Sequence, residues 1–311
     1  MNSTPRPPSL ARPMKTNLDK KEICCIIVTY NPDNLLTELV NTIHNQVDSI
    51  IIVDNYSDEK GLEIISEEAK RLNVHVIRNN QNLGIAKALN QGVLLAKELN
   101  YSWAITFDQD SAPFNNIIAI INEVYSSYPE KNRIGAIGVN YQGGIKRSSF
   151  GKSNSEKFCE KDYLITSGCL ISVGTCFEIG GFREDFFIDN VDLEYSLRLR
   201  ENGKVLLLTR EEGMQHIAGD PGFKNFFGLK LISSNHNIIR RYYMSRNHVI
   251  LTKEYFFSFP YFIAKLNYFY LISIIKIILI DNDRKAKIKA SIKGIKDGIL
   301  SSFKSKKLID K

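Results

Sequence analysis

The chain has 311 residues, a net charge of +7 and an apolar fraction of 43%, which suffice for one large domain, or a domain with an appendage. Its five cysteines are odd in number and form no C-x-x-C pair, which argues against a disulfide framework and a zinc cage. Residues 1–21 lack the apolar stretch of a secretory signal and are rich in Pro, Arg, Ser and Asn. We therefore expect a disordered leader and a cytosolic protein with reduced thiols.

Apolar runs and helical periodicities alternate along the first half of the chain. Runs rich in β-branched and aromatic residues predict buried strands at 23–30, 49–53, 74–77 and 103–107. The spacing of apolar residues between them predicts helices near 35–43, 62–69 and 85–99. This alternation with short loops is typical of a parallel sheet covered by helices.

Each predicted strand is followed by polar residues, at 29–31, 54–55, 82–84 and 108–110. Such residues are also ordinary turn formers. In a parallel sheet, however, the carboxyl ends of the strands meet at one edge and form a crevice where ligands bind. The four ends together therefore favour a nucleotide site. The sequence has neither a G-x-G-x-x-G nor a G-x-x-x-x-G-K-[ST] motif, which disfavours a dinucleotide enzyme and a P-loop ATPase.

The fourth strand ends in two carboxylates, Asp108 and Asp110, which are separated by Gln109. Pro113 then prevents the ladder from continuing. Two carboxylates beside a turn can share Mg²⁺ or Mn²⁺, and such a cation takes phosphate oxygens as further ligands. Taken alone, such a triplet is more often an acidic surface turn, so the choice depends on the rest of the sequence.

The second half is predicted to hold a helix at 117–125, strands at 134–139, 162–172 and 203–208, and a polar surface loop at 140–161. A further helix is expected to begin near 188–190, with Asp192 and Glu194 in its first turn. The helix dipole alone favours acids there. A carboxylate at this place could also serve as a general base.

Six short segments, taken in order, resemble the inverting family-two glycosyltransferases of the GT-A fold, and among these the bacterial rhamnosyltransferases of polysaccharide and O-antigen assembly. The segments are IVTYN at 27–31, VDN at 53–55, NLGIA at 82–86 with Asn90 and Gly92, FDQDS at 107–111, GGF at 180–182 with FIDNVDLEY at 187–195, and His216 with Gly219. The resemblance covers about residues 23–246. It implies an α/β GT-A fold with a mostly parallel sheet, a sugar-nucleotide donor, a divalent metal and transfer to a hydroxyl with inversion. For the rhamnosyltransferase branch, the implied donor is dTDP-L-rhamnose.

The resemblance also implies roles for individual residues. Thr29 and Tyr30 would line the base pocket, and Asp54 would bond to the base or ribose. Asn82 and Gly84 would let the chain approach the donor closely. The implied donor-binding residues are Thr29, Tyr30, Asn31, Asp54, Asn82, Gly84, Lys87, Asp108, Gly168 and Arg246, and the implied metal ligands are Asp108, Asp110 and His216. Gln109 has no metal role in this assignment, and a lone histidine such as His216 is more often an ordinary polar residue.

For catalysis, the resemblance places the general base at Asp192 and an acceptor-orienting carboxylate at Glu194. Asp189 is the runner-up base. Many relatives have an acid directly before the base, where this chain has Val191. A single in-line displacement needs no covalent nucleophile, and none is evident in the sequence.

The C-terminal part combines basic and apolar residues. Arginines and tyrosines at 240–246 suit a diphosphate or a lipid phosphate, or form a solvated basic helix face. Residues 255–280 are apolar but contain Pro260, Lys265, Asn267 and Lys276, which predicts interfacial helices rather than a good membrane span. Isoleucines at 288, 292, 295 and 299 recur among lysines, which is typical of a basic amphipathic helix on an anionic membrane. This helix could instead pack on the catalytic domain or on a second copy of the chain.

We therefore expect a leader at 1–21, a catalytic domain at 22–250 and a helical region at 251–311 that contacts a membrane or a partner. The predicted protein is cytoplasmic, peripheral on the inner face of the bacterial plasma membrane, and transfers a sugar to a lipid-linked saccharide.

A UDP- or GDP-sugar donor is an alternative. A nucleotidyltransferase would need a basic Gly-rich loop near the first strand, which is missing. A non-catalytic nucleotide-binding or nucleic-acid-binding protein is a further alternative, but the positive charge lies mainly in the tail and no aromatic-basic RNA motif occurs, so we expect no nucleic-acid partner.

Overall fold

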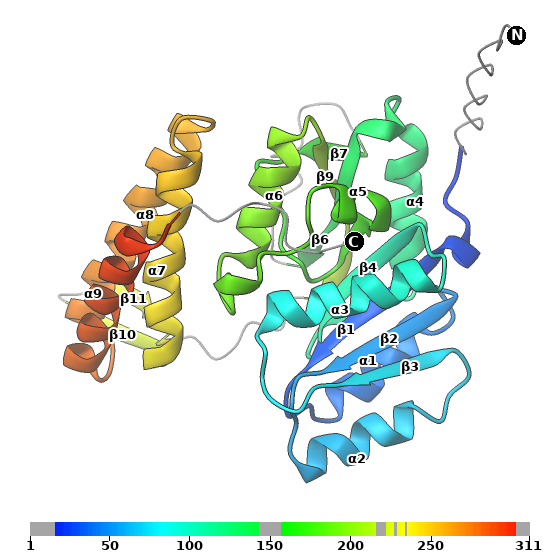
Figure 1. Ribbon diagram of the computed structural model, residues 1–311, viewed down its shortest axis with the longest axis horizontal. Helices are drawn as coiled ribbons and strands as arrows, with labels where there is room; N and C mark the ends of the chain where they lie inside the picture. Colours follow the sequence, from blue (N-terminus) through cyan, green and yellow to red (C-terminus); the bar gives the residue numbers. More distant parts are fainter. Residues whose placement is uncertain (1–15, 143–156, 216–221, 227–228, 234, 303–311) are drawn as a thin grey trace, which may run out of the picture.

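The computed structural model describes residues 16–142, 157–215, 222–226, 229–233 and 235–302 (Figure 1). The four strands predicted in the first half are present, as β1 (Ile23–Thr29), β2 (Ser49–Asp54), β3 (Val74–Arg78) and β4 (Trp103–Asp108). They lie in the order β3-β2-β1-β4 and all pair in parallel. The register places Thr29 beside Asp54 and Val28 beside Asp108. The predicted polar strand ends are therefore brought to one edge of the sheet.

Helices cover both faces of this parallel half. They are α1 (Leu35–Ile43), α2 (Glu59–Glu68), α3 (Ile85–Glu98) and α4 (Ile117–Ser127), and a short 3-10 turn precedes β1 (Lys20–Glu22). Side chains alternate along β1, so that Cys24 and Ile26 pack under α3 while Cys25 and Ile27 pack with α1 and α4. Because β1 is buried on both faces, its sequence is an unbroken apolar run.

The second half of the sheet is mixed rather than mostly parallel. Its strands are β5 (Ala112–Pro113), β6 (Ile134–Gln142), β7 (Phe158–Glu160), β8 (Cys169–Ser172) and β9 (Val205–Gln215). β8 lies antiparallel between β4 and β6, whereas β6 and β9 are parallel. β5 and β7 each pair antiparallel with β9. The periodicity of single strands carries no information about their direction, so this mixture was not predicted.

Two predicted segments of the second half differ from the structure. The strand expected at 162–172 is reduced to β8, because Gly168 adopts a φ of +71°, which interrupts an extended strand. The loop expected at 140–161 contains the end of β6 and all of β7, and its residues 143–156 lie outside the described residues. Short elements follow at α5 (Val173–Glu178) and in 3-10 turns at Lys131–Arg133 and Glu184–Phe186, and then α6 (Val191–Glu201) begins as predicted.

Three helices and a hairpin form the C-terminal part, which lies beside the sheet in Figure 1. They are β10 (Gly222–Phe226), β11 (Leu229–Ser233), α7 (Ile238–Tyr255), α8 (Pro260–Leu279) and α9 (Arg284–Leu300). The buried carboxylate of Asp281 lies 3.3 Å from Arg241 of α7 and 3.2 Å from Lys287 of α9. This triad ties the three helices together. The boundary that we expected after residue 250 falls inside α7, because α7 packs on both the hydrophobic core of the sheet domain and α9.

α8 is one continuous helix that contains Lys265, Asn267 and Lys276. Pro260 occupies its first turn, where no backbone N–H is needed, so the proline starts the helix instead of breaking it. By length and composition alone, α8 could cross a membrane, and most of its surface is exposed. α9 packs on α7 through Gly294 and Gly298, while Ile292 and Ile299 are exposed. Ile288 and Ile295 are half-buried, so only part of the apolar stripe faces outward.

Candidate functional site

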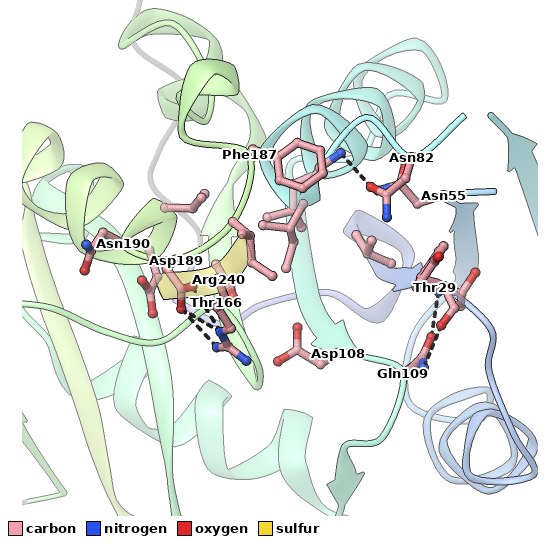
Figure 2. Close-up of a pocket in the computed structure, with 18 of the residues that line it drawn as sticks. Thr29, Asn55, Asn82, Asp108, Gln109, Thr166, Phe187, Asp189, Asn190 and Arg240 are labelled. Carbon is pink, nitrogen blue, oxygen red and sulfur yellow. Dashed lines mark hydrogen bonds and ion pairs between the residues drawn. The ribbon is translucent and has the colours of Figure 1, made fainter. Parts of the chain in front are cut away.

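A cleft of about 500 Å³ lies at the carboxyl edge of β1 and β4 (Figure 2). Its walls come from the two strand ends, the loop before α3, the loop before β8, the segment that leads into α6, and one side chain of α7. The lining residues are Val28, Thr29, Tyr30, Asn55, Asn82, Gly84, Ile85, Leu89, Asp108, Gln109, Asp110, Thr166, Phe187, Ile188, Asp189, Asn190, Val191, Asp192 and Arg240. The predicted convergence of strand ends with the start of α6 is therefore observed.

Four aspartates give this cleft a strongly acidic character. Burial, together with the charges of Asp110 and Asp192, raises the pKa of Asp108 to about 6. Burial likewise raises the pKa of Asp192 to about 6, although the backbone N–H of Leu193 opposes this shift. Each ionised carboxylate makes it harder for its neighbour to ionise. A bound cation would therefore stabilise the ionised form of both.

The acidic end of β4 fits a divalent metal by its chemistry, since carboxylate oxygens are the ligands that Mg²⁺ and Mn²⁺ prefer. Asp108 and Asp110 both line the cleft. The described residues contain no group of three His, Cys, Asp or Glu side chains arranged around one point. His216, the third predicted ligand, lies outside the described residues.

Gln109, which has no metal role in the sequence assignment, joins the ends of β1 and β4. Its side-chain oxygen accepts a hydrogen bond of 2.7 Å from the backbone N–H of Tyr30, and its amide nitrogen donates one of 3.2 Å to the carbonyl of the same residue (Figure 2). The side chain of Tyr30 remains half exposed at the cleft. Its ring is therefore available to contact a flat ligand such as a nucleotide base.

Asn55 and Asn82 fix the loop before α3. Asn55 donates a hydrogen bond of 2.9 Å to the Asn82 side chain, which also accepts one of 3.0 Å from the backbone of Gly84. Gly84 has a φ of +85°, and a Cβ at this position would lie 2.6 Å from the ring and the carbonyl of Phe187. A close approach that requires glycine is therefore made to Phe187, and Gly84 also lines the cleft.

Two other predicted donor residues lie beside the cleft. Asp54 is 1% exposed, and its carboxylate accepts hydrogen bonds from the hydroxyls of Thr29 and Ser57. The backbone N–H of Asn31 donates to the Ser57 hydroxyl at 2.8 Å, while its side chain accepts from the backbone of Asp58. Neither residue lines the cleft. Both hold the turns after β1 and β2, next to Tyr30 and Asn55 of the cleft lining.

Lys87, Gly168 and Arg246 also lie away from the cleft lining. Lys87 forms a 3.1 Å ion pair with Glu184. A Cβ on Gly168 would lie 2.7 Å from the sulfur of Met214, so this glycine serves a close-packed turn. Arg246 donates a 2.8 Å hydrogen bond to the carbonyl of Asp185. All three residues have other partners in this structure, and their contact with the donor stays a prediction.

Glu194 is a core residue, which corrects its assignment as an acceptor-orienting group. Its side chain is 1% exposed, pairs with Arg198 at 2.7 Å and accepts a 2.9 Å hydrogen bond from the hydroxyl of Tyr255. Residues two apart on a helix are separated by roughly 200°. Because Asp192 faces the cleft, Glu194 must face the core.

Replacing Glu194 with Gln should therefore affect stability more than catalysis. We expect the free energy of unfolding to fall by about 3–5 kcal/mol, because the buried Arg198 would lose its charge partner. Urea denaturation would measure this loss, with the exposed Glu63→Gln as a control that should change stability by no more than about 0.5 kcal/mol. A Glu194→Gln protein with unchanged stability but a raised KM for acceptor would restore the original assignment.

Asp189 and Arg240 form an ion pair across one wall of the cleft. Both carboxylate oxygens of Asp189 lie 3.0 Å from the Arg240 Nε (Figure 2). Asp189 and Asn190 have φ values of +64° and +60°, and the Asn247 amide holds this strained turn by donating to the carbonyls of Ile188 and Asp189. Arg240 is the one cation among the described residues of the lining. In the sequence, Arg240 is one of three arginines within 240–246, and the sequence does not indicate which of them reaches the cleft.

Comparison with known proteins agrees with this geometry. A model of the family described as "Glycosyl transferase family 2" matches residues 24–185. The chain is 28% identical over 244 residues to dTDP-rhamnosyl transferase RfbF of Shigella flexneri, a match that covers 75% of this chain and 80% of that protein. It also resembles the solved structure of GalNAc-T7 with UDP, GalNAc and Mn²⁺, with a TM-score of 0.58 and 17% identity over 75% of this chain and 48% of the other. The mannosyltransferase PcManGT of Pyrobaculum calidifontis, in complex with GDP-Man and Mn²⁺, gives a TM-score of 0.52 and 15% identity over 73% of this chain and 62% of the other. The chain thus spans about half of the first of these structures and under two thirds of the second, and both show that the fold is GT-A.

Proposed function

We propose, from the premise that this chain belongs to glycosyl transferase family 2, that it transfers L-rhamnose from dTDP-L-rhamnose to a hydroxyl of a lipid-linked saccharide. The donor is supported by the similarity to dTDP-rhamnosyl transferase RfbF, which extends over most of both chains. The observation that carries the proposal is the cleft, where the two acids that end β4 face the acid that begins α6. We place the product in cell-surface polysaccharide synthesis.

Asp192 is the proposed general base. It lines the cleft from the first turn of α6 and is ionised at neutral pH, since its pKa is about 6. It can therefore accept the proton of an acceptor hydroxyl that attacks the sugar from the side opposite the leaving diphosphate, which inverts the configuration at the sugar carbon. Asp189 is less suited to this role, because it is already paired with Arg240.

Arg240 and the β4 acids would serve the opposite end of the donor. The guanidinium of Arg240 can exchange its bonds to Asp189 for bonds to diphosphate oxygens. Asp108 and Asp110 would hold Mg²⁺ or Mn²⁺, which when bound neutralises the charge that develops on the leaving diphosphate. The Mn²⁺ in the GalNAc-T7 and PcManGT structures supports such a metal.

The C-terminal helices are proposed to attach the enzyme to the cytoplasmic face of a membrane. Large apolar side chains are exposed on α8 and α9, namely Tyr261, Tyr268, Phe269, Leu271, Ile275, Ile278, Ile292, Ile299 and Leu300. Exposed lysines such as Lys265, Lys289 and Lys293 lie among them. Apolar residues bordered by lysines are typical of a surface that binds anionic lipids. The described apolar surface would equally suit pairing of two copies, which the mass of the detergent-free protein in solution would reveal.

Release of nucleoside diphosphate from a panel of sugar nucleotides would test the donor and the metal together. We expect release or thermal stabilisation with dTDP-L-rhamnose, dependent on Mg²⁺ or Mn²⁺ and abolished by EDTA. Asp110→Ala should lose this response, whereas Glu98→Ala, which removes an exposed acid at the end of α3, should retain it. Preference for a UDP- or GDP-sugar would overturn the rhamnose assignment, and full activity in EDTA would overturn the metal.

A further inference from the structure

One side chain of α7 holds the turn that leads into α6. Asn247 is fully buried within the protein. Its amide nitrogen donates to the backbone carbonyls of Phe186 at 2.8 Å, Ile188 at 3.0 Å and Asp189 at 2.9 Å. Its amide oxygen accepts a hydrogen bond of 3.0 Å from Arg246. Because carbonyl oxygens can only accept hydrogen bonds, the Asn247 amide must point its nitrogen toward the turn.

The turn needs this support because its backbone is strained. Phe187, Asp189 and Asn190 have φ values of +53°, +64° and +60°, which residues other than glycine seldom adopt. The carbonyl of Phe187 is held from another side, by the backbone N–H of Ile85 at 2.7 Å. Each backbone carbonyl from 186 to 189 therefore accepts a hydrogen bond, and the turn is held between α7 and the start of α3.

This turn sets the place where α6 begins. Asn190 is the left-handed residue directly before the helix, and its carbonyl accepts a hydrogen bond of 2.9 Å from the backbone N–H of Glu194. Asp192 is the second residue of the helix and lines the cleft together with Asp189 and Asn190. A rotation of the backbone within the turn would therefore move the carboxylate of Asp192.

The rest of α6 is held independently of the turn. Leu193 and Leu197 are buried in the hydrophobic core. The guanidinium of Arg198 donates a hydrogen bond of 2.6 Å to the carbonyl of Gly181. Loss of the Asn247 amide should therefore release the entry to the helix without unfolding the helix itself.

We propose that Asn247 is a positioning residue for catalysis, which fixes Asp192 at the acceptor hydroxyl by holding the turn at 186–190. The inference rests on the proposed function, in which Asp192 is the general base. It adds a residue that does not line the cleft and acts through the backbone of the turn. Displacement of a catalytic group by about 1 Å can lower a rate by about 10²-fold.

Asn247→Ala removes the three hydrogen bonds to the turn. We expect kcat for nucleoside diphosphate release from dTDP-L-rhamnose to fall by about 10²-fold, because the base is displaced from the acceptor. The KM for the donor should stay within about threefold, because the acids that end β4 lie outside this turn. Asn247→Ser keeps one hydrogen-bond donor, so its kcat should lie between those of the alanine variant and the wild type. It also serves as the test variant if the alanine protein does not fold.

Asn267→Ala is the matched control, because it truncates another asparagine that joins two helices. The Asn267 side chain accepts a hydrogen bond of 2.9 Å from Thr252 and lies 2.7 Å from the ring nitrogen of His248, so it joins α8 to α7. We expect this variant to lose stability in thermal denaturation, while its kcat stays within about twofold of the wild type.

A double variant distinguishes positioning of the base from a general loss of structure. Asp192→Asn/Asn247→Ala should be no more than about twofold slower than Asp192→Asn alone, because the position of an absent base no longer matters. Losses of kcat that multiply in the double variant, an unchanged kcat in Asn247→Ala, or an equal loss in Asn267→Ala would each overturn the inference.

Failure of the proposed function would give a different result, which the wild-type protein shows by itself. If the wild type turns over another sugar nucleotide but not dTDP-L-rhamnose, the proposed donor is refuted, and the same variants are compared on the donor that reacts. If the wild type turns over no sugar nucleotide, the proposed function is refuted and this inference with it.

Discussion

Replacing Asp192 with Asn is expected to lower kcat by roughly 10²–10⁴-fold, which is the usual contribution of a general base. The amide has nearly the shape of the carboxylate and can still accept the hydrogen bond from the backbone of Leu193. It cannot take a proton from an acceptor hydroxyl. The donor is held by the other end of the cleft, so its KM should remain near the wild-type value. Steady-state kinetics with saturating metal would measure both constants.

The pH profile of the wild-type enzyme should show the same group. Asp192 acts in its ionised form, and burial raises its pKa to about 6. Activity should therefore be full above this pH and should fall about tenfold per pH unit as the pH drops below 6. Asp108 has a similar pKa in the metal-free chain, but a bound divalent cation lowers the pKa of its ligands. At saturating metal, the acid limb of the profile should thus report Asp192.

Asp189→Asn is the matched control for this prediction. It removes a carboxylate of the same cleft, three residues away, which is engaged by Arg240. We expect a smaller loss of kcat and an acid limb that persists but moves toward lower pH, because the charge of Asp189 contributes to the raised pKa of Asp192. If Asp189→Asn abolished turnover while Asp192→Asn retained it, the base would be Asp189, and the pairing with Arg240 would have to open during the reaction.

The parallel half of the fold was predictable because its strands are buried on both faces. β1 and β2 are unbroken apolar runs that end in polar residues, and the structure confirms their parallel pairing and common edge. The end of β4 and the start of α6 were predicted as well, and this locates the acids that stand at these two boundaries. Asp108, Asp110 and Asp192 therefore line one cleft, as the sequence indicated.

What could not be predicted depends on side-chain direction rather than on element boundaries. Glu194 lies in the correct turn of α6 but on its opposite side, because a shift of two residues reverses the face of a helix. Gly84 lines the cleft, but the contact that requires a glycine there is to Phe187, a residue about a hundred positions away. In α9, the glycines rather than the isoleucine stripe make the close contacts with α7. Local spacing does not specify such long-range partners.

Helical phase also decides which arginine reaches the cleft, and this can be tested. Arg240 and Arg246 are six residues apart on α7, which separates their directions by roughly 240°. Arg240 lines the cleft, while Arg246 contacts Asp185. We expect Arg240→Ala to lower kcat/KM for the donor by about 10²–10³-fold, as for the loss of one group that stabilises charge in the transition state. Arg240→Lys should recover part of this loss, because lysine restores the charge but not the two-pronged geometry.

Arg246→Ala separates the structural assignment from the one based on sequence. Its loss should lower stability through the contact with Asp185, which a thermal denaturation curve would show, while the KM for the donor stays near wild type. The opposite pattern, with a raised donor KM in Arg246→Ala and none in Arg240→Ala, would require α7 to rotate when the donor binds. Arg241, Asp281 and Lys287 tie α7 to α8 and α9. If the loss of Arg240 and not of Arg246 impairs donor use, the helices proposed to contact the membrane therefore also hold the donor-binding Arg240 in place.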